Sequence, residues 1–206
     1  NSKDFIIKDG RHSVVEKTIF RKSLNAFVPN DCSLSTNEHL WLITGPNMAG
    51  KSTFLRQNAH IIILAQIGSY VPAKQAKIGI ASKLFSRIGA SDNISKGQST
   101  FMVEMLETSN IIKNADDKSF IILDEIGRGT STFDGLAIAW AIIEKVLRSN
   151  KSRTLFATHY HELTEIEKTN SKVKNVSCEI KEWNDEIIYS YKVVEGKSKG
   201  SLGIKV

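Results

Sequence analysis

The segment of the sequence that most constrains the fold is LITGPNMAGKSTFL, residues 42–55. An apolar run leads into a loop with two glycines, and residues 51–67 then carry apolar side chains at helical spacing until Gly68. Gly45 to Ser52 match the pattern G-x-x-x-x-G-K-[ST], in which backbone N–H groups and the N-terminus of the next helix face phosphate oxygens. The pattern predicts a nucleotide site formed by Gly45, Pro46, Asn47, Met48, Ala49, Gly50, Lys51, Ser52 and Thr53.

Four side chains are expected to act on the phosphates. The ammonium of Lys51 would neutralise the β and γ phosphates, and the hydroxyl of Ser52 would ligate Mg²⁺. A second apolar run, residues 120–123, ends in the adjacent acids Asp124 and Glu125. We expect Asp124 to reach the Mg²⁺ shell and Glu125 to face a water in line with the γ phosphate.

A histidine follows the third apolar run, residues 154–157. His159 lies two residues beyond this run and is expected to contact the γ phosphate or the attacking water. His161 is the alternative, and we favour His159 because it is closer to the end of the predicted strand.

The order of apolar and amphipathic segments predicts the fold class. Apolar strands alternate with helical patterns, which indicates an α/β fold with a mostly parallel sheet flanked by helices on both faces. Residues 173–194 surround Asn184–Asp185, a turn signal, and predict an additional antiparallel hairpin. Residues 1–30 look irregular and extended, and residues 1–206 are expected to form a single domain. Further helices are expected at 134–147, with Asp134 as N-cap, and at 161–168.

Composition limits the other classes of function. The chain of 206 residues has a formal charge of +6, but Lys and Arg are scattered, which favours a solvated surface over a basic binding patch. The longest apolar run, residues 61–65, is far shorter than the ~20 residues that span a bilayer. We therefore expect a soluble intracellular protein without membrane association. Cys32 and Cys178 form no C-x-x-C pair and are expected to be reduced thiols. Because the sequence lacks an initiator Met, we expect a fragment of a longer protein.

Four long motifs together point to a known family. They are GPNMAGKST, DNISKGQSTFMVEM (residues 92–105), LDEIGRGTSTFDGLAIAWA (residues 123–141) and FATHYHEL (residues 156–163). In this order they resemble the C-terminal ATPase domain of the MutS family of DNA mismatch repair proteins, and the resemblance runs from Arg11 to Ile204. It implies a P-loop NTPase fold of the ABC type that hydrolyses ATP to ADP and phosphate with Mg²⁺.

The resemblance also implies further site residues. Two such domains face each other in the family, so that Ser99 of one chain contacts the γ phosphate bound to the other, and the segment 127–134 lines the interface. Phe27, 18 residues before Gly45, matches the aromatic residue that stacks on adenine. The implied catalytic residues are Glu125, His159, Lys51 and Ser99.

The implied partners extend beyond this chain. The resemblance predicts a homodimer or a heterodimer with a paralogue through the ATPase face, and a downstream MutL-like repair protein. The sequence contains no Phe-x-Glu, so mismatched DNA is expected to be read by domains outside it. The protein would be cytoplasmic in a bacterium and nuclear or organellar in a eukaryote.

One departure from the family pattern and three alternatives accompany this interpretation. Ser177 follows Asn175-Val176 where relatives usually carry an adenine-packing His, which predicts one-sided stacking of the base.

Residues 94–98, ISKGQ, resemble the LSGGQ segment of transporter-type ABC ATPases, but those proteins usually have Pro after the Asp-Glu pair, where this chain has Ile126. A small-molecule kinase and a nucleotide-dependent interaction module with little turnover are the other readings.

Overall fold

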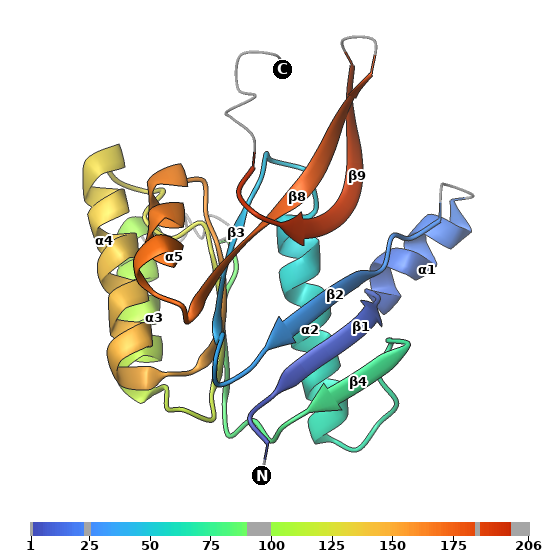
Figure 1. Ribbon diagram of the computed structural model, residues 1–206, viewed down its shortest axis with the longest axis horizontal. Helices are drawn as coiled ribbons and strands as arrows, with labels where there is room; N and C mark the ends of the chain where they lie inside the picture. The colour runs from blue at the N-terminus through green and yellow to red at the C-terminus, as the bar shows by residue number, and fades with distance from the viewer. Residues whose placement is uncertain (1, 23–25, 90–99, 184–185, 199–206) are drawn as a thin grey trace.

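A mixed sheet forms the centre of the molecule. The computed structural model describes residues 2–22, 26–89, 100–183 and 186–198. Among these residues, six strands form one sheet in the order β5-β6-β7-β3-β8-β9 (Figure 1). The first five run parallel, and β9 pairs antiparallel with β8. Their bounds are β3 (Leu40–Thr44), β5 (Leu84–Arg87), β6 (Phe120–Asp124), β7 (Arg153–Ala157), β8 (Val173–Trp183) and β9 (Glu186–Glu195).

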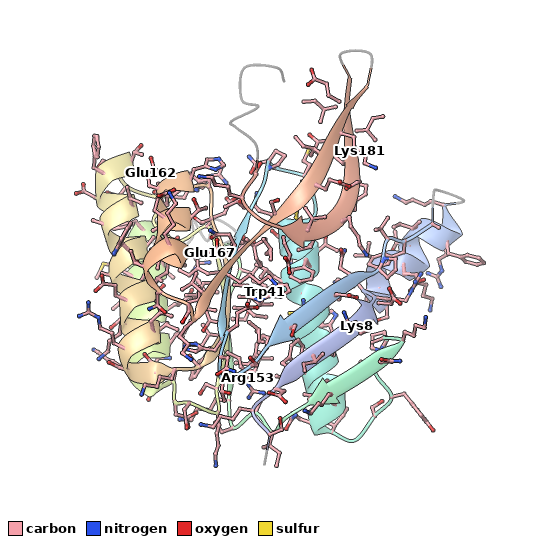
Figure 2. All side chains as sticks on the ribbon, in the orientation of Figure 1. Lys8, Trp41, Arg153, Glu162, Glu167 and Lys181 are labelled. Carbon is pink, nitrogen blue, oxygen red and sulfur yellow. The ribbon has the colours of Figure 1, made fainter. Side chains whose placement is uncertain are left out.

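Helices and a smaller sheet cover the two faces of the central sheet (Figure 1). One face packs against α2 (Lys51–Gln66) and the antiparallel sheet β2-β1-β4, and the other packs against α3, α4 and α5. The hairpin β8–β9 extends beyond these layers, and Lys181 marks its outer part (Figure 2). The remaining elements are α3 (Thr100–Asn114), α4 (Thr132–Lys145), α5 (Ile166–Thr169), a π-helical turn (Val146–Asn150) and a 3₁₀ helix (His161–Glu165).

The central strands are apolar throughout because both of their faces are buried. In β3, Trp41 and Ile43 belong to the core beside α2, whereas Leu40 and Leu42 belong to the core beside α3 and α4. Trp41 lies between the large sheet and the layer formed by α2 and the small sheet (Figure 2), and its ring stacks on Phe54 of α2 at a centroid distance of 6.4 Å. This two-sided burial explains why such strands show no polar alternation.

The expectation that residues 1–30 are irregular is wrong. They contain β1 (Phe5–Gly10) and α1 (Ser13–Arg21), and β1 pairs antiparallel with β2 (Asn30–Leu34) and β4 (Gln75–Ile78). The strand forms because pairing partners tens of residues away bury its apolar side chains, which a local pattern does not show. At its own start, α1 is capped by His12, whose Nδ1 accepts a hydrogen bond from the N–H of Val15.

The other sequence-based boundaries agree with the structure, with one exception. The three apolar strands, the helix that ends before Gly68, the helical segment at 161–168 and the antiparallel hairpin at 173–194 are confirmed. The fold class is confirmed as α/β with a mixed sheet. However, the N-cap of α4 is Ser131, three residues before the expected Asp134: the Ser131 hydroxyl accepts from the N–H of Asp134 and donates to its carboxylate at 2.6 Å. The turn at 184–185 lies outside the described residues.

The structure also describes two features that the sequence analysis considered, namely membrane-spanning segments and the cysteines. In the part of the chain that the structure describes, no helix combines the length and apolar character needed to cross a membrane. Cys32 in β2 and Cys178 in β8 are both buried with free thiols, and burial raises the pKa of Cys178 to about 11.

Candidate functional site

The glycine-containing loop joins the carboxyl end of β3 to the N-terminus of α2. Gly45 has φ of +137° and Gly50 has φ of +101°, conformations that side chains disfavour. At Gly45 a Cβ atom would also lie 3.2 Å from Cβ of Cys178, so the loop approaches β8 closely. Among the described residues no side chain caps α2, and its first N–H groups are therefore open toward the loop. A helix N-terminus in this setting favours anions.

Lys51 directs its ammonium into the loop. Its side chain is only 5% exposed, and Nζ donates hydrogen bonds to the carbonyl oxygens of Gly45 at 2.7 Å and Pro46 at 3.1 Å. Oε1 of Glu125 lies 3.8 Å from the same nitrogen. A nearly buried cation held mainly by neutral carbonyls leaves strong attraction for an anion that enters the loop.

Ser52 and Asp124 bring two oxygen ligands together. The Ser52 hydroxyl donates a hydrogen bond of 2.6 Å to Oδ2 of Asp124. The other carboxylate oxygen, Oδ1, is buried and has no hydrogen-bond partner among the described residues. Burial raises the pKa of Asp124, although the hydrogen bond from Ser52 opposes the shift. An orphaned carboxylate oxygen beside a hydroxyl fits Mg²⁺, which prefers oxygen ligands.

Glu125 occupies a strained position directly after β6. Its φ is +53°, which is uncommon for a residue other than glycine, and its N–H donates to the carbonyl of Ala157 at 2.9 Å. Its Oε2 accepts a hydrogen bond of 2.5 Å from Nη1 of Arg128. The strain turns the Glu125 side chain away from the direction that a regular strand would give it, toward Lys51.

His159 follows β7, next to the end of β6. Partial burial lowers the pKa of His159, while the carboxylate of Glu125 opposes the shift. The ring centroids of His159 and Tyr160 are 4.1 Å apart. His161, the alternative, begins the 3₁₀ helix. His159 is exposed and does not line the cavity of the loop, so its placement in the site stays a prediction.

Most of the residues predicted from the sequence line one cavity of about 160 Å³. Its walls are Pro46, Asn47, Met48, Gly50, Lys51, Ser52, Thr53 and Glu125. Asp124 joins this group through Ser52, and Gly45 through Lys51. Ser99 lies outside the described residues.

A larger cavity of about 650 Å³ adjoins the loop on the side of the hairpin. It is lined by Phe27, Met48, Gly50 and two aromatic residues of β9, Tyr189 and Tyr191. Phe27 was expected from the sequence, whereas the two tyrosines were not, because the pairing of β9 with β8 places them beside a loop that lies far away in the chain. The guanidinium carbon of Arg11 lies over the Phe27 ring, 5.5 Å from the ring centroid.

Ser177 does not take part in this cavity. It is buried in β8, where it pairs with Thr44 of β3. Tyr191, in contrast, lines the cavity together with Phe27, and its backbone carbonyl accepts a hydrogen bond of 2.9 Å from Asn30. The cavity therefore has a second aromatic wall, which the expectation of one-sided stacking based on Ser177 did not include.

Comparisons with known proteins give the family. A family model described as MutS domain V matches residues 41–206. The DNA mismatch repair protein MutS of Thermodesulfovibrio yellowstonii is 57% identical over 210 residues, covering 100% of this chain and 25% of that protein. Its counterpart in Clostridium novyi is 58% identical over 206 residues, covering 98% and 22%, and that of Ruegeria sp. is 54% identical over 207 residues, covering 100% and 24%.

The present chain spans about a quarter of the length of these curated relatives. The matches do not favour a transporter-type ATPase. They confirm the resemblance that the four sequence motifs carry. The chain belongs to the MutS family of DNA mismatch repair proteins, of which it represents the domain V region.

Proposed function

We propose that this chain is a P-loop ATPase of the ABC type, which binds ATP with Mg²⁺ and hydrolyses it to ADP and phosphate. The observation that carries the proposal is the single cavity in which the loop, Lys51, Ser52 and Glu125 meet. Phosphoryl transfer to water requires a cationic group, oxygen ligands for a metal ion and a carboxylate close together.

The loop would bind the phosphates. The open N–H groups of α2 and the ammonium of Lys51 both attract negative charge, and a phosphate oxygen can replace the carbonyls of Gly45 and Pro46 as acceptor. Asn47, within the same loop, would hold the nucleotide through its amide. Because the loop already has the required backbone conformation, little ordering accompanies binding.

Ser52 and Asp124 would hold Mg²⁺. When bound, Mg²⁺ supplies positive charge that polarises the phosphoryl group. The 2.6 Å hydrogen bond between the two residues supports this role because it brings their oxygen atoms together, and Oδ1 of Asp124 has no hydrogen-bond partner among the described residues.

Glu125 would orient the attacking water and accept its proton, as general bases do. Its ion pair with Arg128 and its contact with Lys51 hold the carboxylate at the mouth of the loop. His159 would contact the water or the γ phosphate through its imidazole. The adenine base would lie in the larger cavity, between Phe27 and Tyr191.

The complete protein would use this reaction in mismatch repair. On the family resemblance, a second copy or a paralogue contributes Ser99 to the nucleotide, and ATP closes the two domains against each other. Other domains would bind mismatched DNA, and a MutL-like protein would respond to the closed state. ATPase activity of the present chain should therefore be weak and rise with protein concentration.

Glu125→Gln tests the proposal. We expect the variant to bind ATP and Mg²⁺ with a Kd like that of the wild type in calorimetry, and to release phosphate about 10²- to 10⁴-fold more slowly. Glu162→Gln, at an exposed carboxylate on the 3₁₀ helix (Figure 2), should release phosphate at the wild-type rate. Unchanged turnover in Glu125→Gln would remove Glu125 from the mechanism. The absence of binding heat at millimolar ATP in folded wild-type protein would overturn the function itself.

A further inference from the structure

Gly127, two residues after Glu125, is held by hydrogen bonds on both sides of its backbone. Its N–H donates to Oε1 of Glu104 at 2.7 Å, and its carbonyl accepts from the hydroxyl of Tyr160 at 2.9 Å. Both hydrogen bonds are buried, and the two partners come from α3 and from the segment after β7. Burial and the charge of Glu104 raise the pKa of Tyr160, so its hydroxyl remains a donor at neutral pH.

Close packing adds to these hydrogen bonds. Gly127 has φ of +87°, and a Cβ atom there would lie 2.6 Å from the carbonyl oxygen of Gly135. A Cβ atom on Gly135 would lie 2.0 Å from the hydroxyl oxygen of Tyr160. The start of α4 therefore packs directly against the segment after Glu125. Glu104, Tyr160 and Gly135 together fix the position of Gly127.

Arg87 of β5 orients the Glu104 carboxylate. Nη2 of Arg87 lies 3.5 Å from Oε2 of Glu104, the oxygen that does not bind Gly127, and both side chains are almost buried. Nε of Arg87 lies 2.9 Å from Oε2 of Glu107, whose side chain is half exposed. A buried carboxylate with a cation on one oxygen and a backbone N–H on the other has little freedom to move.

Glu104 also borders the acids of the candidate site. A cavity of about 240 Å³ is lined by Arg87, Glu104, Asp124, Glu125 and Arg128, together with Gly89, Thr100, Phe101 and Gly129. Glu104 is thus one wall of the space behind Asp124 and Glu125. Its only hydrogen bond described here goes to the backbone of the loop that follows those acids.

We propose that Glu104 is a positioning residue of the hydrolytic site: it fixes Gly127 and thereby the strained backbone that aims Glu125. The proposal rests on the ATPase function proposed above. Glu104 is not among the residues that line the cavity of the loop. It acts through the Gly127 N–H, with Arg87 holding the carboxylate and Tyr160 holding the opposite side of the same residue. Since Glu125 has a strained φ, loss of one support allows its carboxylate to move away from the attacking water.

The test compares three variants of the 206-residue chain at one protein concentration. Glu104→Ala should lower kcat for ATP about 10- to 100-fold, because small displacements of a catalytic group cost rate steeply, while Kd for ATP and Mg²⁺ stays within about threefold. Glu104→Gln keeps an oxygen that can accept from Gly127, and should recover kcat to within about fivefold of the wild type. Glu107→Ala removes the neighbouring partner of Arg87 without touching Gly127, and should leave kcat within about twofold.

Amide hydrogen exchange gives a readout that does not depend on turnover. In Glu104→Ala, exchange should accelerate in residues 125–131 and stay unchanged in the strands 120–124 and 153–157. Tyr160→Phe removes the second support without changing α3, and it replaces Glu104→Ala in the test if that variant does not fold. It should show the same accelerated exchange, and the same fall in kcat with Kd for ATP and Mg²⁺ nearly unchanged.

Two results would overturn the proposal. One is wild-type exchange and wild-type kcat in folded Glu104→Ala or Tyr160→Phe. The other is an equal fall of kcat in Glu104→Ala and Glu107→Ala, which would assign the effect to the ion pairs of Arg87. If the wild type binds no ATP, the proposed function fails, whereas accelerated exchange limited to residues 125–131 would still show that Glu104 fixes this loop.

Discussion

The Ser52 hydroxyl, at the start of α2, donates a 2.6 Å hydrogen bond to Asp124, which ends β6. The two residues are 72 positions apart in the sequence, and the parallel order β6-β7-β3 brings the carboxyl ends of their strands to one edge of the sheet. The pair joins the loop to the acidic strand end, and the remaining oxygen of Asp124 is buried without a partner among the described residues. Burying this carboxylate lowers the free energy of unfolding.

Asp124→Asn should stabilise the chain in the absence of nucleotide. Burial raises the pKa of Asp124 above its unfolded value, so the free energy of unfolding falls as the pH rises through the interval between the two pKa values. The variant should therefore have a higher Tm than the wild type at pH 7, and the difference should vanish in acid, where Asp124 is protonated. Added ATP and Mg²⁺ should raise the Tm of the wild type more than that of the variant.

Asp116→Asn is the matched control. The hydroxyl of Ser119 lowers the pKa of Asp116 to about 2, so its ionised form is favoured by folding, and the stability it adds is lost as the pH falls toward that value. Its replacement should lower the Tm at pH 7. A lower Tm in both variants would contradict the account of Asp124.

The pH dependence of phosphate release should distinguish His159 from His161. Because burial lowers the pKa of His159 from 6.5, its ring is neutral at pH 7, and protonation in acid should remove its contact with the water or phosphate. We expect wild-type kcat to be constant above about pH 7 and to fall below the lowered pKa. His159→Asn should lower kcat on the order of 10²-fold and lose this acidic limb. His161→Asn should keep both; the reverse outcome would exchange their roles.

Phe27 and Tyr191 should determine affinity for the base and not for the phosphates. Replacing either by Ala should cost about 1–3 kcal/mol in ATP binding, which is the range measured for stacking of bases on aromatic side chains. Binding of tripolyphosphate with Mg²⁺, which has no base, should be unchanged in calorimetry. Tyr70→Ala, at a side chain that is 99% exposed, provides the control. Equal losses for ATP and tripolyphosphate would show that the aromatic cavity does not hold the base.

Gly45→Ala should cost more stability than Gly68→Ala, because its φ of +137° is less accessible to a side-chain-bearing residue than +76° and a steric contact adds to the strain. Both glycines have positive φ, but a Cβ at Gly68 would meet nothing within 4 Å, whereas at Gly45 it would lie 3.2 Å from Cys178. Gly68→Ala should cost about 1 kcal/mol in the free energy of unfolding, and Gly45→Ala about 1–3 kcal/mol more, as measured by urea denaturation. Only Gly45→Ala should lose ATP binding. Equal costs would mean that the loop can move away from β8.

The elements that the sequence predicted well are those whose pattern is local. Residues 41–44, 120–123 and 154–157 are buried on both faces, so their apolar runs are continuous and bounded by polar loops. The phosphate-loop pattern is equally local, since its residues are consecutive. These features sufficed for the α/β class and for most residues of the candidate site.

The elements that it missed depend on partners distant in the chain. No residue of α1 is buried, so this helix is not part of the core that the apolar runs of the sequence indicate. The strand β1 is defined by its pairing with β2 and β4. Tyr191 reaches the loop only because β9 folds back on β8. At α4, Ser131 and Asp134 are both good N-caps, and only the observed hydrogen bonds decide between them.

Lys51 stabilises the turn of the glycine-containing loop through hydrogen bonds within the loop. Its ammonium already bonds to the carbonyls of Gly45 and Pro46, which closes the turn on itself. Under the proposed function, exchange of these acceptors for a phosphate would leave the path of the chain intact, so the entropy lost on association would be mainly that of the incoming molecule. The same lysine would then stabilise the turn first and contact the phosphate afterwards.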